Sequence, residues 1–227
     1  MNLAIFDLDN TLINGDSDYL WGEFLIEQGL VDAEHYHREN TRFYEQYKSG
    51  SLDIYEFLRF SLKPLSEHEM ETLTRLHQQF MNQKIQPIML PAAFELINKH
   101  KQAGDFTLII TATNRFVTDP IAQAFGIKTL IATEPELRNN RYTGNVEGTP
   151  CFQQGKVQRL EQWVKQTGHS LSGSWFYSDS HNDTPLLSLV THPIAVDPDP
   201  KLKQIAVERG WPVISLRHKI NPQTSEQ

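Results

Sequence analysis

Two aspartates, Asp7 and Asp9, follow directly after the apolar run from Leu3 to Phe6, which we expect to be a buried strand. Burying unpaired carboxylates costs free energy, so two of them at the end of such a strand need compensation of their charge. A carboxylate can attack phosphorus as a nucleophile, and a second one can protonate a leaving group and then take a proton from water. The pair therefore indicates nucleophilic and acid–base chemistry.

Further polar residues follow other expected strands. Thr111 ends the second strand, Asp179 and Asp183 come after a later one, and Lys156 lies near the start of the helix between them. In open α/β sheets, ligands bind beyond the carboxyl ends of the strands, so we expect these side chains to converge. Neighbouring carboxylates repel one another and require a divalent cation and a lysine, and magnesium prefers oxygen ligands. This set predicts a magnesium-assisted phosphoryl-transfer site.

The elements that must position these residues follow an alternating pattern. Apolar runs predict strands at residues 3–6, 106–111, 127–132, 174–178, 193–196 and 212–216. Helical patterns at 91–104 and 154–168 lie between them, and turn residues predict a small hairpin with its tip at Asn139 and Asn140. Strand–helix alternation predicts the α/β class with a doubly wound, mostly parallel, Rossmann-like sheet.

Residues from about 17 to 84 interrupt the alternation with helical patterns only. Ser17, Ser51 and the sequence from Ser66 to Glu69 are the predicted helix caps in this segment. We therefore predict a core domain made of residues 1–13 and 88–227, with a helical cap, residues 14–87, inserted after the first strand. A cap rooted there is well placed to cover the strand end.

The bulk composition narrows the class of protein. The 227 residues are 39% hydrophobic and 22% charged, as in ordinary globular proteins, and the net charge of -7 argues against nucleic-acid and anionic-membrane partners. A single cysteine, Cys151, and the absence of a secretion signal predict a cytoplasmic protein. The polar residues 221–227 are expected to be loose. The expected partner is a small-molecule phosphate ester, and the oligomeric state is left open.

The segments "DLDNT", "TAT", "GKV" and "DSHND", in this order, resemble the four motifs of the haloacid dehalogenase superfamily phosphatases. The resemblance extends from Leu3 to about Val196. It implies that Asp7 is the nucleophile and Asp9 the general acid and base. It implies phosphate contacts from Thr111, Lys156 and the backbone of Asn10 and Ala112. It also implies that Mg²⁺ is held by Asp7, the Asp9 carbonyl and Asp179, with support from Asp183.

The helical insert is similar to the cap of the superfamily subclass IB, which holds phosphoserine phosphatase. In that family an acid shortly after the first motif binds the substrate amine, and Asp16 falls at its position. An arginine there grips the substrate carboxylate, but the matching position here is Ser61. Arg59 lies two residues earlier, turned by roughly 200° to the far face of its helix. This departure disfavours phosphoserine.

The segment "NGDSDYLWGEF" is closer to a bacterial branch of the subclass that includes histidinol-phosphate phosphatases. A ligand with an amine and an imidazole but no carboxylate would suit Asp16 and Asp18. Tyr19 and Trp21 could stack on a ring, although aromatics at helical spacing are more often core residues. Asp16 and Ser17 could also simply cap a helix.

These observations favour a magnesium-dependent phosphomonoesterase that acts on a small amine-bearing metabolite through an aspartyl phosphate, with histidinol phosphate as the leading candidate. The alternatives are a phosphoserine phosphatase or a broad-specificity phosphatase. A non-enzyme alternative is a phospho-receiver or phosphate-binding module, which needs neither Asp9 nor a cap. The letters "GDS" also fit a serine-hydrolase block with Ser17 as nucleophile, but the Asp-x-x-His partner, Asp32 to His35, comes too early.

Overall fold

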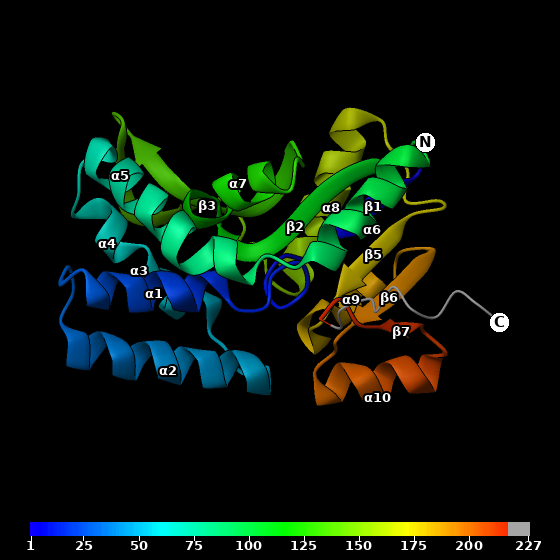
Figure 1. Ribbon diagram of the computed structural model, residues 1–227, viewed down its shortest axis with the longest axis horizontal. Coiled ribbons are helices and arrows are strands. Elements are labelled where there is room, and N and C mark those ends of the chain that lie inside the picture. The colour runs from blue at the N-terminus through cyan, green and yellow to red at the C-terminus, as the bar shows by residue number, and fades with distance from the viewer. Residues whose placement is uncertain (218–227) are drawn as a thin grey trace.

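The computed structural model describes residues 1–217, and the predicted loose tail at 221–227 lies outside them. A seven-stranded sheet forms the centre of the molecule, in the order β4-β3-β2-β1-β5-β6-β7 (Figure 1). Its strands are β1 (Leu3–Phe6), β2 (Phe106–Asn114), β3 (Thr129–Arg138), β4 (Arg141–Glu147), β5 (Trp175–Ser178), β6 (His192–Val196) and β7 (Val213–Ile214). All neighbouring strands are parallel except β3 and β4, which confirms the predicted α/β class and mostly parallel sheet.

Hydrophobic clusters cover both faces of the sheet. Leu3 and Ile5 of β1 belong to one cluster, and Ala4 and Phe6 belong to the other, because successive residues of a strand point to opposite faces. The first cluster includes residues of α8 (Gln154–Thr167), α9 (Thr184–Leu187) and α10 (Pro200–Arg209). The second includes residues of α6 (Pro91–Gln102) and α7 (Arg115–Ala124). The sheet is thus doubly wound, as predicted.

Helices alone connect β1 to β2. They are α1 (Ser17–Glu27), α2 (Ala33–Ser49), α3 (Ile54–Ser61), α4 (Lys63–Ser66) and α5 (Met70–Phe80), followed by a π-helical turn, η1 (Met81–Ile85), and a 3-10 turn, η2 (Gln86–Ile88). We call α1 to α5 the cap helices. They extend to one side of the sheet in Figure 1 and share a hydrophobic cluster with α6 and α7.

The chain leaves the sheet and returns to it at one crossing. Ile13 and Met89 form an antiparallel bridge there, and the Leu90 N–H donates to the Leu12 carbonyl at 3.2 Å. The crossing lies where the sequence predicts the boundaries of the cap, at residues 14 and 87. The division into two domains stays a prediction.

The β3–β4 hairpin also reaches the cap helices. Its turn residues, Asn139 and Asn140, have φ angles of 49° and 61°, as the predicted hairpin requires. Strand β3 continues beyond the predicted end at Ala132 because its second half pairs with β4 instead of β2. Gly144 of β4 approaches Ser66 so closely that a Cβ atom there would lie 3.3 Å from the serine hydroxyl. The hairpin thus extends the sheet onto α4.

Two of the predicted helix caps are displaced by aspartates. Helix α1 is capped by Asp16, whose side chain accepts two backbone N–H groups, and Ser17 is the first helical residue. Helix α3 is capped by Asp53, whereas Ser51 lies in the preceding loop. The predictions of Ser17 and Ser51 as caps are therefore wrong, whereas the interpretation of Asp16 as a helix cap is confirmed. In both helices an aspartate stands directly before the first helical residue and caps at least as well as serine.

The capping box predicted from Ser66 to Glu69 is also wrong. The Ser66 hydroxyl donates to the Lys63 carbonyl at 2.7 Å within the short helix α4. Helix α5 begins only at Met70, and Glu69 makes no side-chain cap. The short helix α4, which starts at Lys63 with Pro64 in its first turn, takes up Ser66, so this serine is not free to cap α5.

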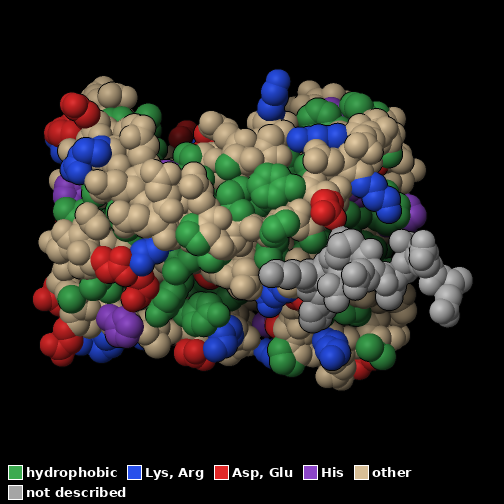
Figure 2. Space-filling model, viewed as in Figure 1, with side chains coloured by type: hydrophobic (Ala, Val, Ile, Leu, Met, Phe, Trp, Pro, Cys, Tyr) green, Lys and Arg blue, Asp and Glu red, His purple; other side chains and the backbone are tan. Residues whose placement is uncertain are grey.

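The surface carries charges of both signs. On the face drawn in Figure 2, Asp and Glu side chains are interspersed with Lys and Arg. Within residues 1–217, no helix has the length and apolar character to span a membrane. Cys151 is fully buried, and its thiol lies 3.7 Å from the Ile131 carbonyl.

Candidate active site

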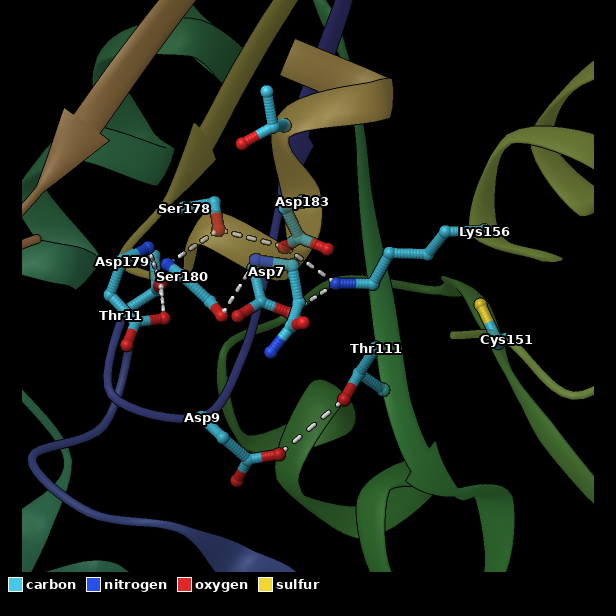
Figure 3. Close-up of polar contacts among 12 residues, drawn as sticks. Asp7, Asp9, Thr11, Thr111, Cys151, Lys156, Ser178, Asp179, Ser180 and Asp183 are labelled. Carbon is cyan, nitrogen blue, oxygen red and sulfur yellow. Dashed lines mark hydrogen bonds and ion pairs between the residues drawn. The ribbon is translucent and has the colours of Figure 1, made fainter. Parts of the chain in front are cut away.

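A cleft opens between the carboxyl ends of β1 and β2 and the cap helices α1 to α3. Its lining includes most of the residues that the sequence singled out: Asp7, Asp9, Asn10, Asp16, Asp18, Thr111, Ala112, Lys156 and Asp183. Asp179 stands beside Asp7 on the neighbouring loop (Figure 3). The topology therefore brings together residues that lie far apart in the chain.

Lys156 joins two aspartates at the base of the cleft. Its ammonium group donates to Asp7 Oδ1 at 2.8 Å and to Asp183 Oδ2 at 2.7 Å, and all three side chains are buried (Figure 3). Ser178 adds a hydrogen bond of 2.7 Å to Asp183 Oδ2. Burial opposes the charge of Lys156, but Asp183 and Asp7 outweigh it and raise the pKa of the lysine above its usual value. The lysine is thus held as a cation.

The start of α8 is shaped to deliver this lysine. Lys156 is the third residue of the helix and follows Gly155. A Cβ atom on Gly155 would lie 2.1 Å from the Pro150 carbonyl oxygen, so only glycine lets the helix begin so close to the preceding loop. Steric contact with Pro150 therefore explains why a glycine precedes Lys156 in the sequence.

Burial raises the pKa of Asp7 to about 7, because the charge of Lys156 offsets it only in part and Asp183 adds to it. Asp179 is affected in the same way: burial, followed by the charges of Asp7 and Asp183, raises its pKa well above the usual value. The carboxyl groups of Asp7 and Asp179 therefore each disfavour the charged form of the other in the absence of a cation.

Thr11 ties Asp179 to the loop after β1. Its hydroxyl donates to Asp179 Oδ1 at 3.2 Å and accepts the Asp179 N–H at 3.1 Å. Within residues 1–217, no three His, Cys, Asp or Glu side chains are grouped so that together they could hold a metal ion. Mg²⁺ does not require such a group, since it binds one or two carboxylates and completes its shell with water and phosphate oxygens. The oxygen donors of Asp7 and Asp179, crowded and short of positive charge, fit that ion.

Asp9 turns away from Asp7 and lies between the sheet and the cap (Figure 3). Its Oδ1 accepts the Ser17 N–H at 2.6 Å, and its Oδ2 accepts the Thr113 hydroxyl at 2.8 Å and lies 3.4 Å from the Thr111 hydroxyl. Burial and the charge of Asp16 raise the pKa of Asp9 to about 6. Asp9 is thus positioned by cap helix α1 through Ser17 and by strand β2 through Thr113.

Two expected phosphate contacts involve the backbone. Asn10 has a φ angle of 56°, and its N–H donates to the Gly15 carbonyl at 2.8 Å. The predicted phosphate contact of Asn10 therefore requires this hydrogen bond to be given up. Ala112 lines the cleft, and its carbonyl accepts the Thr133 hydroxyl at 2.7 Å.

The cap side of the cleft is acidic and aromatic. Asp16 and Asp18 line it, and burial, then the charges of Asp16 and Asp9, raise the pKa of Asp18 well above its usual value. Tyr19 also lines the cleft. Trp21 does not: it is 2% exposed and stacks among aromatic residues of the hydrophobic cluster, so it is a core residue.

Basic residues are scarce in this cleft. Among its described lining residues, Lys156 is the only Lys, Arg or His. Arg59 is exposed and does not line the cleft, and Ser61 is buried. The serine-hydrolase interpretation also fails, since Ser17 is fully buried, and the Asp32 side chain accepts the backbone N–H of the exposed His35 as the cap of α2.

Sequence reasoning missed several residues at this site. Thr113 follows Thr111 by two positions on β2, and strand periodicity, which puts both on one face, could have found it. Thr11 and Ser178 make contacts that no local pattern encodes. Asn40 and Tyr47 of α2 line the cleft, but only the packing of α2 on α1 places them there.

The site and fold define a hydrolase, and a family model for haloacid dehalogenase-like hydrolases matches residues 4–188. The chain belongs to this family. A histidinol-phosphatase of Neisseria meningitidis serogroup C is 47% identical over 220 residues, which cover 95% of this chain and 99% of that protein. Within the family, the protein is a phosphatase.

Solved structures share its architecture. The crystal structure of a protein of unknown function from Bordetella pertussis Tohama I is 47% identical, with a TM-score of 0.89, and the match covers 95% of this chain and 98% of that one. A phospho-aspartyl intermediate analogue of phosphoserine phosphatase has a TM-score of 0.68 at 20% identity, covering 96% of this chain and 94% of that one. At 20% identity, the likeness to the phosphoserine phosphatase structure shows a shared fold and nothing about the substrate.

Proposed function

We propose that this phosphatase is a Mg²⁺-dependent phosphomonoesterase that works through an aspartyl phosphate on Asp7. We further propose that its substrate is a small phosphate ester bearing nitrogen cations, with histidinol phosphate as the leading candidate. One observation carries the proposal: the cleft joins the buried Asp7–Lys156–Asp183 group to an acidic, aromatic wall.

The first chemical step uses Asp7 and Asp9. Lys156 holds Oδ1 of Asp7, so we assign the attack on phosphorus to Oδ2. As this bond forms, the bond between phosphorus and the ester oxygen breaks, and Asp9 gives its proton to the leaving oxygen. In the second step Asp9 takes a proton from water, the water oxygen attacks phosphorus, and the bond to Asp7 breaks. A pKa of about 6 for Asp9 suits a group that both gives and takes a proton near neutral pH.

Phosphate and metal contacts complete the site. We assign the phosphate oxygens to Thr111, Lys156 and the backbone of Asn10 and Ala112. Asp7, Asp179 and the Asp9 carbonyl would hold Mg²⁺, and Asp183 would support it through the shared lysine. When bound, Mg²⁺ supplies positive charge that neutralises the carboxylates and the phosphate.

The cap side favours a substrate without a carboxylate. Asp16 and Asp18 can accept hydrogen bonds from an ammonium group and an imidazole, and Tyr19 is an aromatic lining residue on the same side. A carboxylate at this end would meet two aspartates and, among the described lining residues, no cation apart from Lys156. This disfavours phosphoserine, and the 47% identity to a histidinol-phosphatase supports the same choice.

The test compares histidinol phosphate, phosphoserine, two sugar phosphates and p-nitrophenyl phosphate side by side, with Mg²⁺ and with a chelator. We expect kcat/KM to be highest for histidinol phosphate, by about tenfold or more, and turnover to require the metal. Higher kcat/KM for phosphoserine, or equal values throughout, would replace the substrate assignment. Absence of turnover on every ester would favour the receiver or binding-module alternative.

The expected cytoplasmic location belongs to this proposal and rests on the single cysteine.

A further inference from the structure

A second threonine near the end of β2, Thr113, contacts the carboxyl group of Asp9. Its hydroxyl lies 2.8 Å from Asp9 Oδ2, whereas the Thr111 hydroxyl lies 3.4 Å from the same atom. The Thr111 hydroxyl also accepts the Thr113 N–H at 3.2 Å, which fixes the two residues relative to each other. Thr113 is 7% exposed, so bulk water does not readily replace its hydroxyl.

The two oxygens of Asp9 have partners of different kinds. Oδ1 accepts the backbone N–H of Ser17 at 2.6 Å, and a backbone N–H can only donate. Oδ2 faces the Thr113 hydroxyl, which can rotate and either donate or accept. A proton on Asp9 is therefore compatible with Oδ2 and conflicts with the existing hydrogen bond at Oδ1.

We propose that Thr113 is a positioning residue that holds Asp9 with Oδ2 ready to give and to take the proton. This inference rests on the proposed acid–base role of Asp9. When the ester bond breaks, Oδ2 gives its proton to the leaving oxygen, and the Thr113 hydroxyl donates to the carboxylate that results. When water attacks the aspartyl phosphate, Oδ2 takes the proton of the water and the Thr113 hydroxyl rotates to accept.

The test uses the leaving group. Thr113→Val removes the hydroxyl and keeps the shape, and Thr113→Ser keeps the hydroxyl. Histidinol phosphate releases an alcohol whose oxygen must be protonated, whereas p-nitrophenyl phosphate releases a phenolate that is stable without a proton. We compare kcat/KM, because it includes the steps only up to release of the alcohol or phenol and excludes hydrolysis of the aspartyl phosphate.

We expect Thr113→Val to lower kcat/KM for histidinol phosphate by about 10–100-fold, a part of the ~10²–10⁴-fold that a general acid supplies. We expect a loss below about threefold for p-nitrophenyl phosphate, and near wild-type values for Thr113→Ser on both esters. Thr118→Val is the matched control, since it removes another buried threonine hydroxyl, on α7, which donates to the Asn114 carbonyl instead of Asp9. It should show no dependence on the leaving group.

Equal losses on both esters, or no loss on either, would overturn the inference. Asp9→Asn distinguishes failure of the acid role of Asp9 from failure of the positioning role of Thr113. If the loss in Asp9→Asn does not depend on the leaving group, the acid role of Asp9 fails. If the loss depends on the leaving group in Asp9→Asn but not in Thr113→Val, only the role of Thr113 fails. In the Asp9→Asn background, Thr113→Val should cause no further loss on histidinol phosphate, and a multiplicative loss would contradict the inference. Thr113→Ala serves for the same measurements if the valine variant does not fold.

Discussion

Replacing Lys156 by methionine should destabilise the protein strongly. The lysine is 3% exposed and makes two ion pairs, of 2.8 and 2.7 Å, with Asp7 and Asp183, which are each 4% exposed. Methionine fills a similar volume but leaves both carboxylates without their buried counter-charge. Breaking a buried ion pair by removing one partner costs about 3–5 kcal/mol. For a chain of this size, about 2–4 °C per kcal/mol converts this loss to a fall in Tm of about 6–20 °C.

The loss should depend on pH in a defined direction. The pKa of Asp7 in the folded protein, about 7, lies above its ordinary value of 3.8, so between these values the folded state binds this proton more tightly than the unfolded chain. The stability that this proton contributes is present at low pH and is lost as the pH rises through about 7. Lys156 lowers the pKa of Asp7, so its removal raises that pKa further. The destabilisation should therefore be larger at about pH 8 than at about pH 5.

The assay is urea and thermal unfolding of the metal-free wild type and variant at both pH values. Lys165→Met is the matched control, because it makes the same change at an exposed position of the same helix, α8, and should alter the free energy of unfolding by less than about 0.5 kcal/mol. A loss below about 1 kcal/mol for Lys156→Met, or one that is equal at both pH values, would show that the lysine does not balance these carboxylates in the way described.

Three further predictions concern the chemistry. Asp7→Asn should reduce phosphate release from p-nitrophenyl phosphate to background while the circular dichroism spectrum stays unchanged, and wild-type-like turnover would exclude Asp7 as nucleophile. Asp18→Asn should raise KM for histidinol phosphate by about tenfold or more, which corresponds to the loss of a charged hydrogen bond, and should leave KM for p-nitrophenyl phosphate nearly unchanged. Equal effects on both esters would show that Asp18 does not recognise the substrate. The free energy of unfolding of the metal-free protein should fall from about pH 5 to about pH 8, because the pKa values of Asp7 and Asp9 are raised in the folded state, which therefore loses these protons at a cost. Mg²⁺ should suppress this fall. A pH dependence of stability that Mg²⁺ leaves unchanged would contradict the proposed metal site.

Much of the sheet and the positions of the aspartates could be predicted from the sequence. Buried parallel strands are apolar on consecutive positions, and polar residues follow such a run. Asp7 comes directly after β1 as predicted, whereas β2 continues past its predicted end at Thr111 to Asn114. The pattern is local, so one sequence suffices to recognise it. The limits of β3 were missed because its pairing changes from β2 to β4 midway, which depends on partners distant in the chain.

The helix caps and the fine structure of the site were harder to predict. Ser and Asp cap helices with similar propensity, so a shift of two residues decides between Ser51 and Asp53. Asn40 enters the cleft because Gly22 lets α2 approach α1, where a Cβ atom would lie 2.7 Å from the Asn40 side chain. Such close approach is a property of tertiary packing, and a glycine in a helical pattern does not by itself reveal it.

Asp9 is fastened at one oxygen to Ser17, in the first turn of α1, and at the other to Thr113 of the sheet. The group assigned to proton transfer therefore links the cap helices to the sheet, and the chain passes between these parts at the crossing of Ile13 with Met89. A chimaera that exchanged the whole insert for that of another hydrolase would lose the Ser17 amide along with Asp16 and Asp18, which line the cap side of the cleft. Transplanting specificity onto this scaffold thus requires the new insert to supply an equivalent amide.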